Sequence, residues 1–168
     1  FDGEAEGSAN YMATTPRVFR HGDTEITETS FYEVQRAGTL PRVVEVADGD
    51  AGHYVAELAR IAEKAADEEG LTAIVAADAA RANWLSKQLG ERVQLVDRNS
   101  LMPATGVVLM DLRLAKGLEF DHVVVPDAQA EVYPDTPLAR RRLYTAISRA
   151  MHEVTIVSQG ALTPLLAR

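Results

Sequence analysis

The sequence contains no cysteine, so the chain can form no disulfide and can offer no thiolate to a metal ion. Long apolar runs are absent too, and no stretch approaches the roughly 18 residues that a membrane-spanning helix needs. The first residues, 1–7, carry neither a basic region nor an apolar stretch, so we do not expect them to be a signal peptide. These absences predict a cytoplasmic protein with no membrane partner.

Basic residues are in deficit. The chain has 17 Lys and Arg against 25 Asp and Glu, a formal net charge of −8. Binding to nucleic acid depends largely on neutralising phosphates, so this balance argues against a domain that holds nucleic acid by itself. One local basic cluster stands out, at Arg140, Arg141 and Arg142. As a pattern it is typical of a solvated helix face.

What the sequence does contain, from Arg42 onward, is an alternation of short apolar segments with amphipathic ones. Predicted strands are Arg42–Ala47, Leu71–Ala77, Arg92–Val96, Gly106–Asp111, Asp121–Pro126 and Glu153–Ser158. Predicted helices are Tyr54–Ala65, which Gly70 would end, Ala79–Leu89, which Asp78 would cap, and Leu138–Met151. The alternation predicts an α/β fold, with a mainly parallel sheet covered by helices on both faces.

The segment before this region lacks a sustained period. Residues 1–23 are rich in Gly, Ala, Thr and Ser, and we interpret them as a loosely ordered lead-in or an expression remnant. Thr24–Phe31 alternates weakly and is predicted as a short edge strand. The 168 residues fit one domain, which we place at residues 24–168.

Two segments carry residues suited to chemistry. The first, Leu114–Asp121 (LAKGLEFD), follows a predicted strand, and in parallel sheets function sits on loops at the carboxyl ends of strands. Gly117 would let the backbone approach a ligand closely, and Glu119 could accept hydrogen bonds from sugar hydroxyls. A plain surface connection with a solvated glutamate is the alternative interpretation.

The second segment is Arg141–Ala150 (RRLYTAISRA), in which Arg149 ends a predicted helix just before a buried strand. A guanidinium fixed at the rim of the sheet could reach a phosphate. The alternative is a cation that stabilises the carboxyl end of the helix.

Taken together, AKGLEF at Ala115–Phe120 and LYTAISRA at Leu143–Ala150 resemble motifs V and VI of the UvrD/Rep group of superfamily 1 helicases. The resemblance implies a second RecA-like (P-loop NTPase-like) domain. It implies that Arg149 is the catalytic arginine that reaches the γ-phosphate of ATP. It also implies that Glu119, Gly117 and Lys116 belong to the nucleotide-binding segment.

A narrower likeness concerns the tail. Leu114–Asp121 together with Gly160–Leu166 resembles HelD-type proteins, helicase-like ATPases that bind and recycle RNA polymerase, and Arg20–Gly22 also resembles a stretch of that family. Two positions depart from the DNA-translocating members, which carry Thr-x-His where this chain has Asp111 and Arg113. These two residues are candidate nucleic-acid or partner contacts, and the acidic one predicts weak unwinding. A third departure is Met12, where motif IV of the group has an arginine.

The sequence has no GxxxxGK[ST] (Walker A) and no Asp-Glu magnesium motif. The resemblance therefore implies that the phosphate cradle and the Mg²⁺ ligands lie on a first RecA-like domain of the same protein. We expect no metal ligands in this chain and no ATPase activity from it alone. The predicted function is the C-terminal half of a HelD-like, RNA polymerase-recycling ATPase.

Three alternative functions differ in what they require of these residues. A conventional UvrD-like DNA helicase or translocase would use the same ATP site. A non-catalytic interaction platform would need neither Arg149 nor Glu119, so their presence argues against it. A receiver-like domain is disfavoured because no acidic pair follows an early strand.

Overall fold

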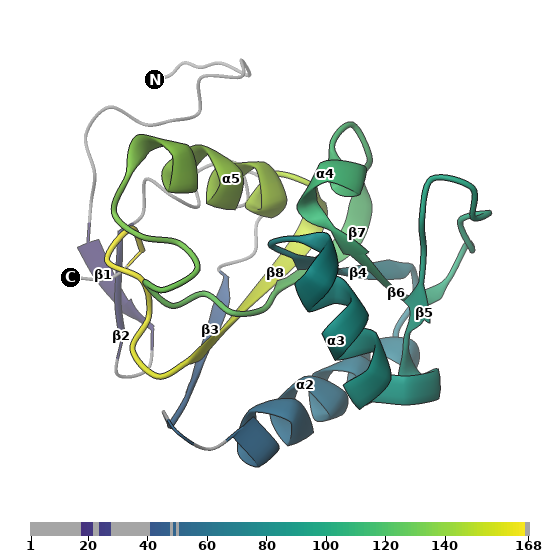
Figure 1. Ribbon diagram of the computed structural model, residues 1–168, viewed down its shortest axis with the longest axis horizontal. Helices are drawn as coiled ribbons and strands as arrows, with labels where there is room; N and C mark the ends of the chain where they lie inside the picture. The colour runs from purple at the N-terminus through teal and green to yellow at the C-terminus, as the bar shows by residue number, and fades with distance from the viewer. Residues whose placement is uncertain (1–17, 22–23, 28–40, 48, 50, 167–168) are drawn as a thin grey trace.

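The computed structural model describes residues 18–21, 24–27, 41–47, 49 and 51–166. Its main feature is a six-stranded sheet, parallel throughout, in the order β3-β8-β7-β4-β6-β5 (Figure 1). The strands are β3 Arg42–Val46, β4 Leu71–Ala76, β5 Gln94–Leu95, β6 Gly106–Asp111, β7 Phe120–Val125 and β8 Ala150–Gln159. The helices are α2 Ala51–Ala66, α3 Ala79–Leu89, the 3₁₀ helix η2 Gly90–Arg92, α4 Leu112–Ala115 and α5 Pro137–Ile147.

The molecule has three layers, with α2 and α3 on one face of the sheet and α4 and α5 on the other (Figure 1). Each face has its own apolar cluster. Every residue of β4 is buried, as expected for a strand that is paired on both sides and covered on both faces. The predicted α/β fold with a parallel sheet is confirmed.

Helix boundaries follow local chemistry. The Asp78 side chain caps α3 by accepting a hydrogen bond from the Arg81 backbone N at 2.8 Å, as predicted. At α5, Thr136 is the N-cap and Pro137 occupies the first turn, where its missing N–H costs nothing. The predicted continuation of α5 to residue 151 is wrong. The helix ends at Ile147 because Ala150 already pairs with Phe120 as the start of a longer β8.

The prediction that Gly70 ends α2 is also wrong, since the helix ends at Ala66. Gly70 lies directly before β4 with φ +90, and a Cβ there would lie 2.5 Å from an Asp121 carboxylate oxygen. That carboxylate accepts a hydrogen bond from the Leu71 backbone N at 2.8 Å. The glycine therefore lets β4 begin against the side chain of Asp121.

Two further boundaries differ from prediction. The strand predicted at Arg92–Val96 is reduced to Gln94–Leu95, because η2 takes up the residues before it. No helix is predicted at residues 112–115, which form the short helix α4 with Asp111 as its N-cap.

Ahead of the main sheet, β1 Val18–His21 and β2 Thr24–Thr27 pair with each other as a separate antiparallel ribbon. The predicted strand from Thr24 is therefore present, but it pairs with β1 and not with an edge of the main sheet. Residues 1–17 and 28–40 lie outside the described part, as does the motif IV-like segment with Met12. No described helix is both long and apolar enough to cross a membrane.

Candidate functional site

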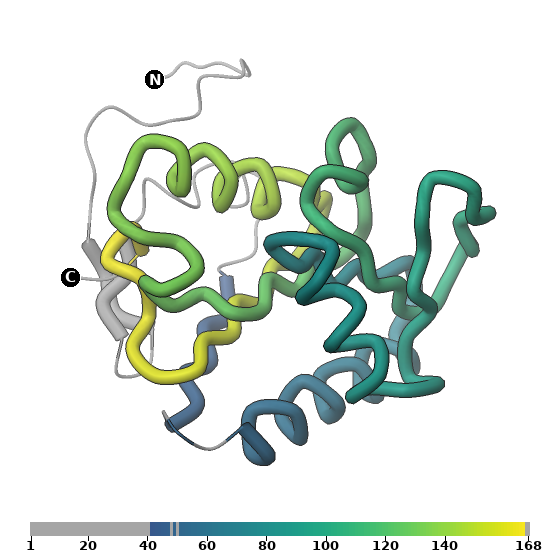
Figure 2. Tube along the Cα trace, viewed as in Figure 1, coloured from purple at the N-terminus to yellow at the C-terminus, as the bar shows by residue number. Residues whose placement is uncertain are grey.

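The two candidate segments meet at one edge of the sheet. Gly117–Glu119 lead directly into β7, and Arg149 leads directly into its neighbour β8. This is the amino-terminal edge of the strands, so the expectation of a carboxyl-end loop is wrong for Gly117–Glu119. Because β6 and β7 both run parallel to β4, the chain that leaves β6 at its carboxyl end must return, through α4, to the amino-terminal edge before β7 begins (Figure 2).

Arg149 is held by weak hydrogen bonds. Its Nε donates to the Thr145 carbonyl at 3.3 Å, and its Nη1 donates to the Leu118 carbonyl at 3.4 Å. A third bond runs from Nη2 to the Ser148 hydroxyl at 3.3 Å. All are longer than the roughly 2.9–3.0 Å typical of N–H···O bonds. Among the residues that the structure describes, no carboxylate pairs with this guanidinium.

The backbone joins the two segments more firmly than the side chain does. The Phe120 N–H donates to the Arg149 carbonyl at 2.9 Å, beside the pairing of Phe120 with Ala150. Arg149 therefore has a fixed backbone position and a loosely held, half-buried head group. Such a side chain can change partner without disturbing the sheet.

The glycine of the first segment, Gly117, has φ +82, a conformation that other residues rarely adopt. A Cβ at this position would meet nothing within 4 Å, so the glycine is required by its backbone conformation and not by crowding. Glu119 and Lys116 are exposed on either side of it. Among the described residues the Glu119 carboxylate makes no salt bridge, which leaves it open to a ligand.

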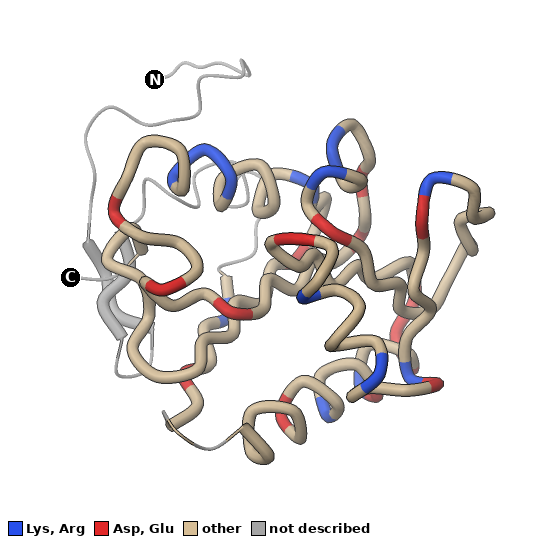
Figure 3. The backbone as a smooth tube through the Cα atoms, in the orientation of Figure 1, with Lys and Arg blue, Asp and Glu red and all other residues tan. Residues whose placement is uncertain are grey.

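A cavity of about 410 Å³ lies at the opposite, carboxyl-terminal edge of β4 and β6. The residues around it are Ala77, Asp78, Ala79, Asp111, Leu112, Arg113, Lys116, Leu138, Arg141, Arg142 and Thr145. Arg113, Lys116, Arg141 and Arg142 are positively charged. Figure 3 shows the basic segments of α5 and of the α4 region from which these side chains come. The formal net charge of −8 gives no indication of this locally positive surface.

Both acidic residues that line the cavity are helix caps. Asp111 caps α4 by accepting a hydrogen bond from the Leu114 backbone N at 2.9 Å, and Asp78 caps α3. The positive ends of two helices therefore lie against these carboxylates. Asp111 therefore caps a helix and also lines the cavity, and its predicted contact with nucleic acid or a partner stays a prediction. Arg113 is exposed and lies at the rim of the cavity.

The basic triplet divides between two roles. Arg140 is exposed, as the solvated-face interpretation predicts. That interpretation is wrong for Arg142, which is half-buried and donates to the Ala77 carbonyl at the end of β4 at 2.6 Å. Arg141 lines the cavity beside it.

A buried network at the end of β7 was not found from the sequence. The Asp127 carboxylate accepts hydrogen bonds from the Tyr54 hydroxyl at 2.7 Å and from Arg81 Nε and Nη2 at 2.8 and 3.0 Å. Arg81 also stacks over Trp84, with its guanidinium carbon 4.2 Å from the ring centroid. The partners are 73 and 46 residues apart in sequence, so no local pattern could reveal them.

Electrostatics in this network favour a fixed protonation state. Burial, and then the neighbouring Asp127, raise the pKa of the Tyr54 hydroxyl well above its usual range. The hydrogen bonds to Asp127 raise the pKa of Arg81. The tyrosine therefore stays neutral and the arginine charged. The network joins α2 and α3 to β7, and we assign it to stability.

Comparisons with known proteins agree with this architecture. The family model of the UvrD-like helicase C-terminal domain matches residues 106–157, which include Gly117, Glu119 and Arg149. A solved structure described as the C-terminal domain of a possible DNA helicase from Lactobacillus plantarum WCFS1 is 42% identical, with a TM-score of 0.68. That match covers 80% of this chain and 83% of the other.

More distant matches include an arterivirus nonstructural protein 10 helicase in complex with DNA, with a TM-score of 0.47 at 13% identity, covering 90% of this chain and 42% of the other. The UvsW helicase of bacteriophage T4 has a TM-score of 0.43 at 11% identity, covering 76% of this chain and 51% of the other. Both are too distant to bear on function. The comparison with curated proteins gave no match. The six-stranded parallel α/β fold and the family match identify a RecA-like helicase domain, and the chain belongs to the family of UvrD-like helicase C-terminal domains.

Proposed function

We propose that this chain is the second RecA-like domain of an ATP-dependent motor and supplies half of its ATP site. The observation that carries the proposal is the junction of Gly117–Glu119 with Arg149 at the amino ends of β7 and β8. It places an open carboxylate and a weakly held guanidinium at one edge of one sheet. A nucleotide bound by a first domain could be contacted there by both.

The proposed roles follow from the chemistry of phosphoryl transfer. Negative charge gathers around the γ-phosphate in the transition state, and Arg149 would stabilise it when the two domains close. Glu119 would accept hydrogen bonds from the ribose, and Lys116 and Gly117 would shape the same segment. ATP and Mg²⁺ would be held by the first domain, whose P-loop and magnesium ligands this sequence lacks. Alone, the chain should show no turnover above background.

The nucleotide assignment has its own test. In the full-length protein, Glu119→Ala should raise the KM for ATP, because a contact to bound nucleotide is lost in the ground state as well as in the transition state. Glu131→Ala, at another exposed glutamate, is the matched control and should leave the KM unchanged. Equal kinetics for both variants would contradict a nucleotide role for Glu119.

For the partner, we propose RNA polymerase, with a HelD-like stroke that displaces it from nucleic acid. The support is the sequence likeness of Leu114–Asp121 and Gly160–Leu166 to HelD-type proteins, together with the net charge of −8. A conventional UvrD-like DNA helicase is the second candidate. One observation favours it: the cations of the 410 Å³ cavity could contact a phosphate backbone. A non-catalytic platform is the third candidate, but it gives no reason for the weakly held guanidinium of Arg149.

The candidates separate in one pair of assays. Purified RNA polymerase is mixed with the full-length protein, with and without ATP, and recovery of the complex is compared with unwinding of a tailed DNA duplex. The polymerase proposal predicts ATP-sensitive capture of polymerase and little unwinding. ATP-dependent unwinding without capture would assign the protein to the conventional helicases.

A further inference from the structure

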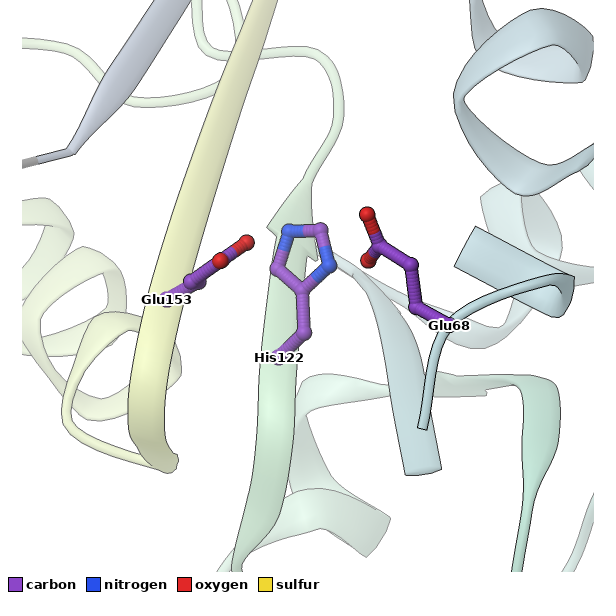
Figure 4. Close-up of side chains that lie close together, drawn as sticks. All are labelled: Glu68, His122 and Glu153. Carbon is purple, nitrogen blue, oxygen red and sulfur yellow. The ribbon is translucent and has the colours of Figure 1, made fainter. Parts of the chain in front are cut away.

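One cluster of ionisable side chains outside the proposed ATP site does not form a shared ligand site. Figure 4 shows the His122 ring between the carboxylates of Glu68 and Glu153, with one ring nitrogen toward each of them. The Nε2 atom lies 2.8 Å from the Thr155 hydroxyl oxygen, which occupies that side of the ring. A single ion bound at Nδ1 could not reach both glutamates, so we assign no ligand to this cluster.

A different surface lies at the carboxyl-terminal edge of the sheet, where two hollows adjoin. The cavity of about 410 Å³ described above extends from α5 to Asp111 and Arg113. A second hollow, of about 500 Å³, is lined by these same two residues and by residues 96–99 of the β5–β6 loop. We call the two hollows together the carboxyl-edge groove. Figure 3 shows basic segments in α5, in the α4 region and in the β5–β6 loop.

Arginines give the carboxyl-edge groove its positive charge. Those that line it are Arg98, Arg113, Arg141 and Arg142. Arg142 donates to the Ala77 carbonyl. The other three are exposed, and the structure gives them no carboxylate partner among the described residues. Guanidinium groups of this kind recognise carboxylates and phosphates, so the groove suits an anionic ligand.

Large apolar side chains border these arginines. Leu138 on α5 lines the groove and is 58% exposed. Leu101 and Met102, in the loop that carries Arg98, are 90% and 39% exposed. Exposed apolar groups of this size beside a hollow are typical of a surface that binds a protein, and Met and Arg are enriched in such surfaces. The ligand should therefore combine negative charge with an apolar group.

Carboxylates in the groove distinguish a peptide from a nucleic acid. Asp78, Asp97 and Asp111 line it, and in each the Oδ1 atom accepts a local hydrogen bond while Oδ2 accepts none among the described residues. A peptide backbone offers N–H donors to such oxygens, whereas a phosphate backbone offers only acceptors and is repelled by them. No described residue that lines either hollow is aromatic, so unpaired bases would find no ring on which to stack.

We propose that the carboxyl-edge groove binds an extended segment of a partner protein in which acidic side chains flank an apolar one. The acidic side chains pair with Arg113 and Arg141, the apolar one lies against Leu138, and backbone N–H groups face Asp111. The groove lies at the edge of the sheet opposite to Arg149. Its assignment therefore does not depend on the proposed ATP site.

The test begins with a phage-displayed library of short random peptides, selected on the immobilised 168-residue chain at physiological salt. We expect the enriched sequences to combine Asp or Glu with Leu, Ile, Met or Phe. The most enriched peptide then receives a fluorescein label, and its affinity is measured by fluorescence anisotropy. Arg113→Ala and Arg141→Ala should each weaken binding by about tenfold, because each removes a charge-assisted contact. Arg140→Ala, exposed on the same helix as Arg141 but outside the groove, should bind as the unaltered chain does.

Leu138→Ser tests the apolar contact and should weaken binding of the same peptide. A thermal melt of each variant confirms that the fold is kept. The proposal is overturned if no peptide is enriched, if the enriched peptides have no excess of acidic residues, or if both arginine variants bind with unchanged affinity. It is equally overturned if a labelled oligothymidylate binds more tightly than the peptide and loses affinity in the same variants, which would assign the groove to single-stranded nucleic acid.

Discussion

At the residue scale, Asp127 is a fully buried carboxylate whose backbone has the unusual φ of 60. Its carboxylate is satisfied on both oxygens by Arg81 and Tyr54. Asp127→Asn should lower the free energy of unfolding by about 3 kcal/mol or more, because it leaves a half-buried guanidinium without its counter-charge. Urea denaturation measures this. Asp135→Asn, at an exposed position, is the control, and equal losses for the two variants would contradict a structural role for the network.

A second prediction compares two glycine substitutions, to separate the cost of steric crowding at Gly70 from the cost of its positive φ. Gly70→Ala combines φ +90 with a Cβ 2.5 Å from Asp121, whereas Gly106→Ala has φ +100 and open space. Both should lose about 1 kcal/mol or more of stability from the positive φ. Only Gly70→Ala should also disturb the hydrogen bond from Leu71 to Asp121. Thermal melts of the two variants check this, and an equal shift would show that the contact with Asp121 is relaxed at no cost.

At the scale of elements, the short helix α4 connects β6 to the Gly117–Glu119 segment. Its cap is the Asp111 carboxylate, which accepts from Leu114 N. Asp111→Ala should lower stability by about 1 kcal/mol, whereas Asp111→Asn, which keeps a capping oxygen, should stay within about 0.5 kcal/mol of the unaltered chain. Denaturant midpoints compare the two. A full loss in Asp111→Asn would mean that the charge, and not the cap, holds this turn.

The sequence predicted most strands and helices of the fold, because the spacing of apolar residues in each segment follows the period of the element that it forms. It could not give the strand order, since β4 is inserted between β6 and β7 by contacts far apart in the chain. Gly117 was expected at the wrong edge for another reason: its segment follows one parallel strand but directly precedes the next, and the chain enters that strand at the amino-terminal edge. The end of α5 was missed because strand pairing at Ala150 overrides helical propensity. The Asp127 network and the cation-lined cavity depend on partners that no local pattern links.

At the scale of the whole molecule, a net charge of −8 coexists with a cavity walled by cations. Any DNA affinity of the chain should therefore be weak at physiological salt and should fall steeply as salt is added, since few phosphates are neutralised against overall repulsion. Fluorescence anisotropy with a labelled single strand measures it. Arg141→Ala should weaken the residual binding, with Arg140→Ala, which lies outside the cavity, as the control. Tight binding that is insensitive to salt would contradict this picture.

At the centre of the proposed function, Arg149 completes an ATP site shared with another domain. The most direct measurement is steady-state ATP hydrolysis by the full-length protein carrying Arg149→Ala, beside a thermal melt of the same variant. Loss of the arginine should lower turnover on the order of a thousand-fold. Stability should change by only about 0.3–1 kcal/mol, because the side chain makes long, weak hydrogen bonds. Near-normal hydrolysis combined with a marked loss of stability would contradict a catalytic role and leave Arg149 as a structural cation at the end of α5.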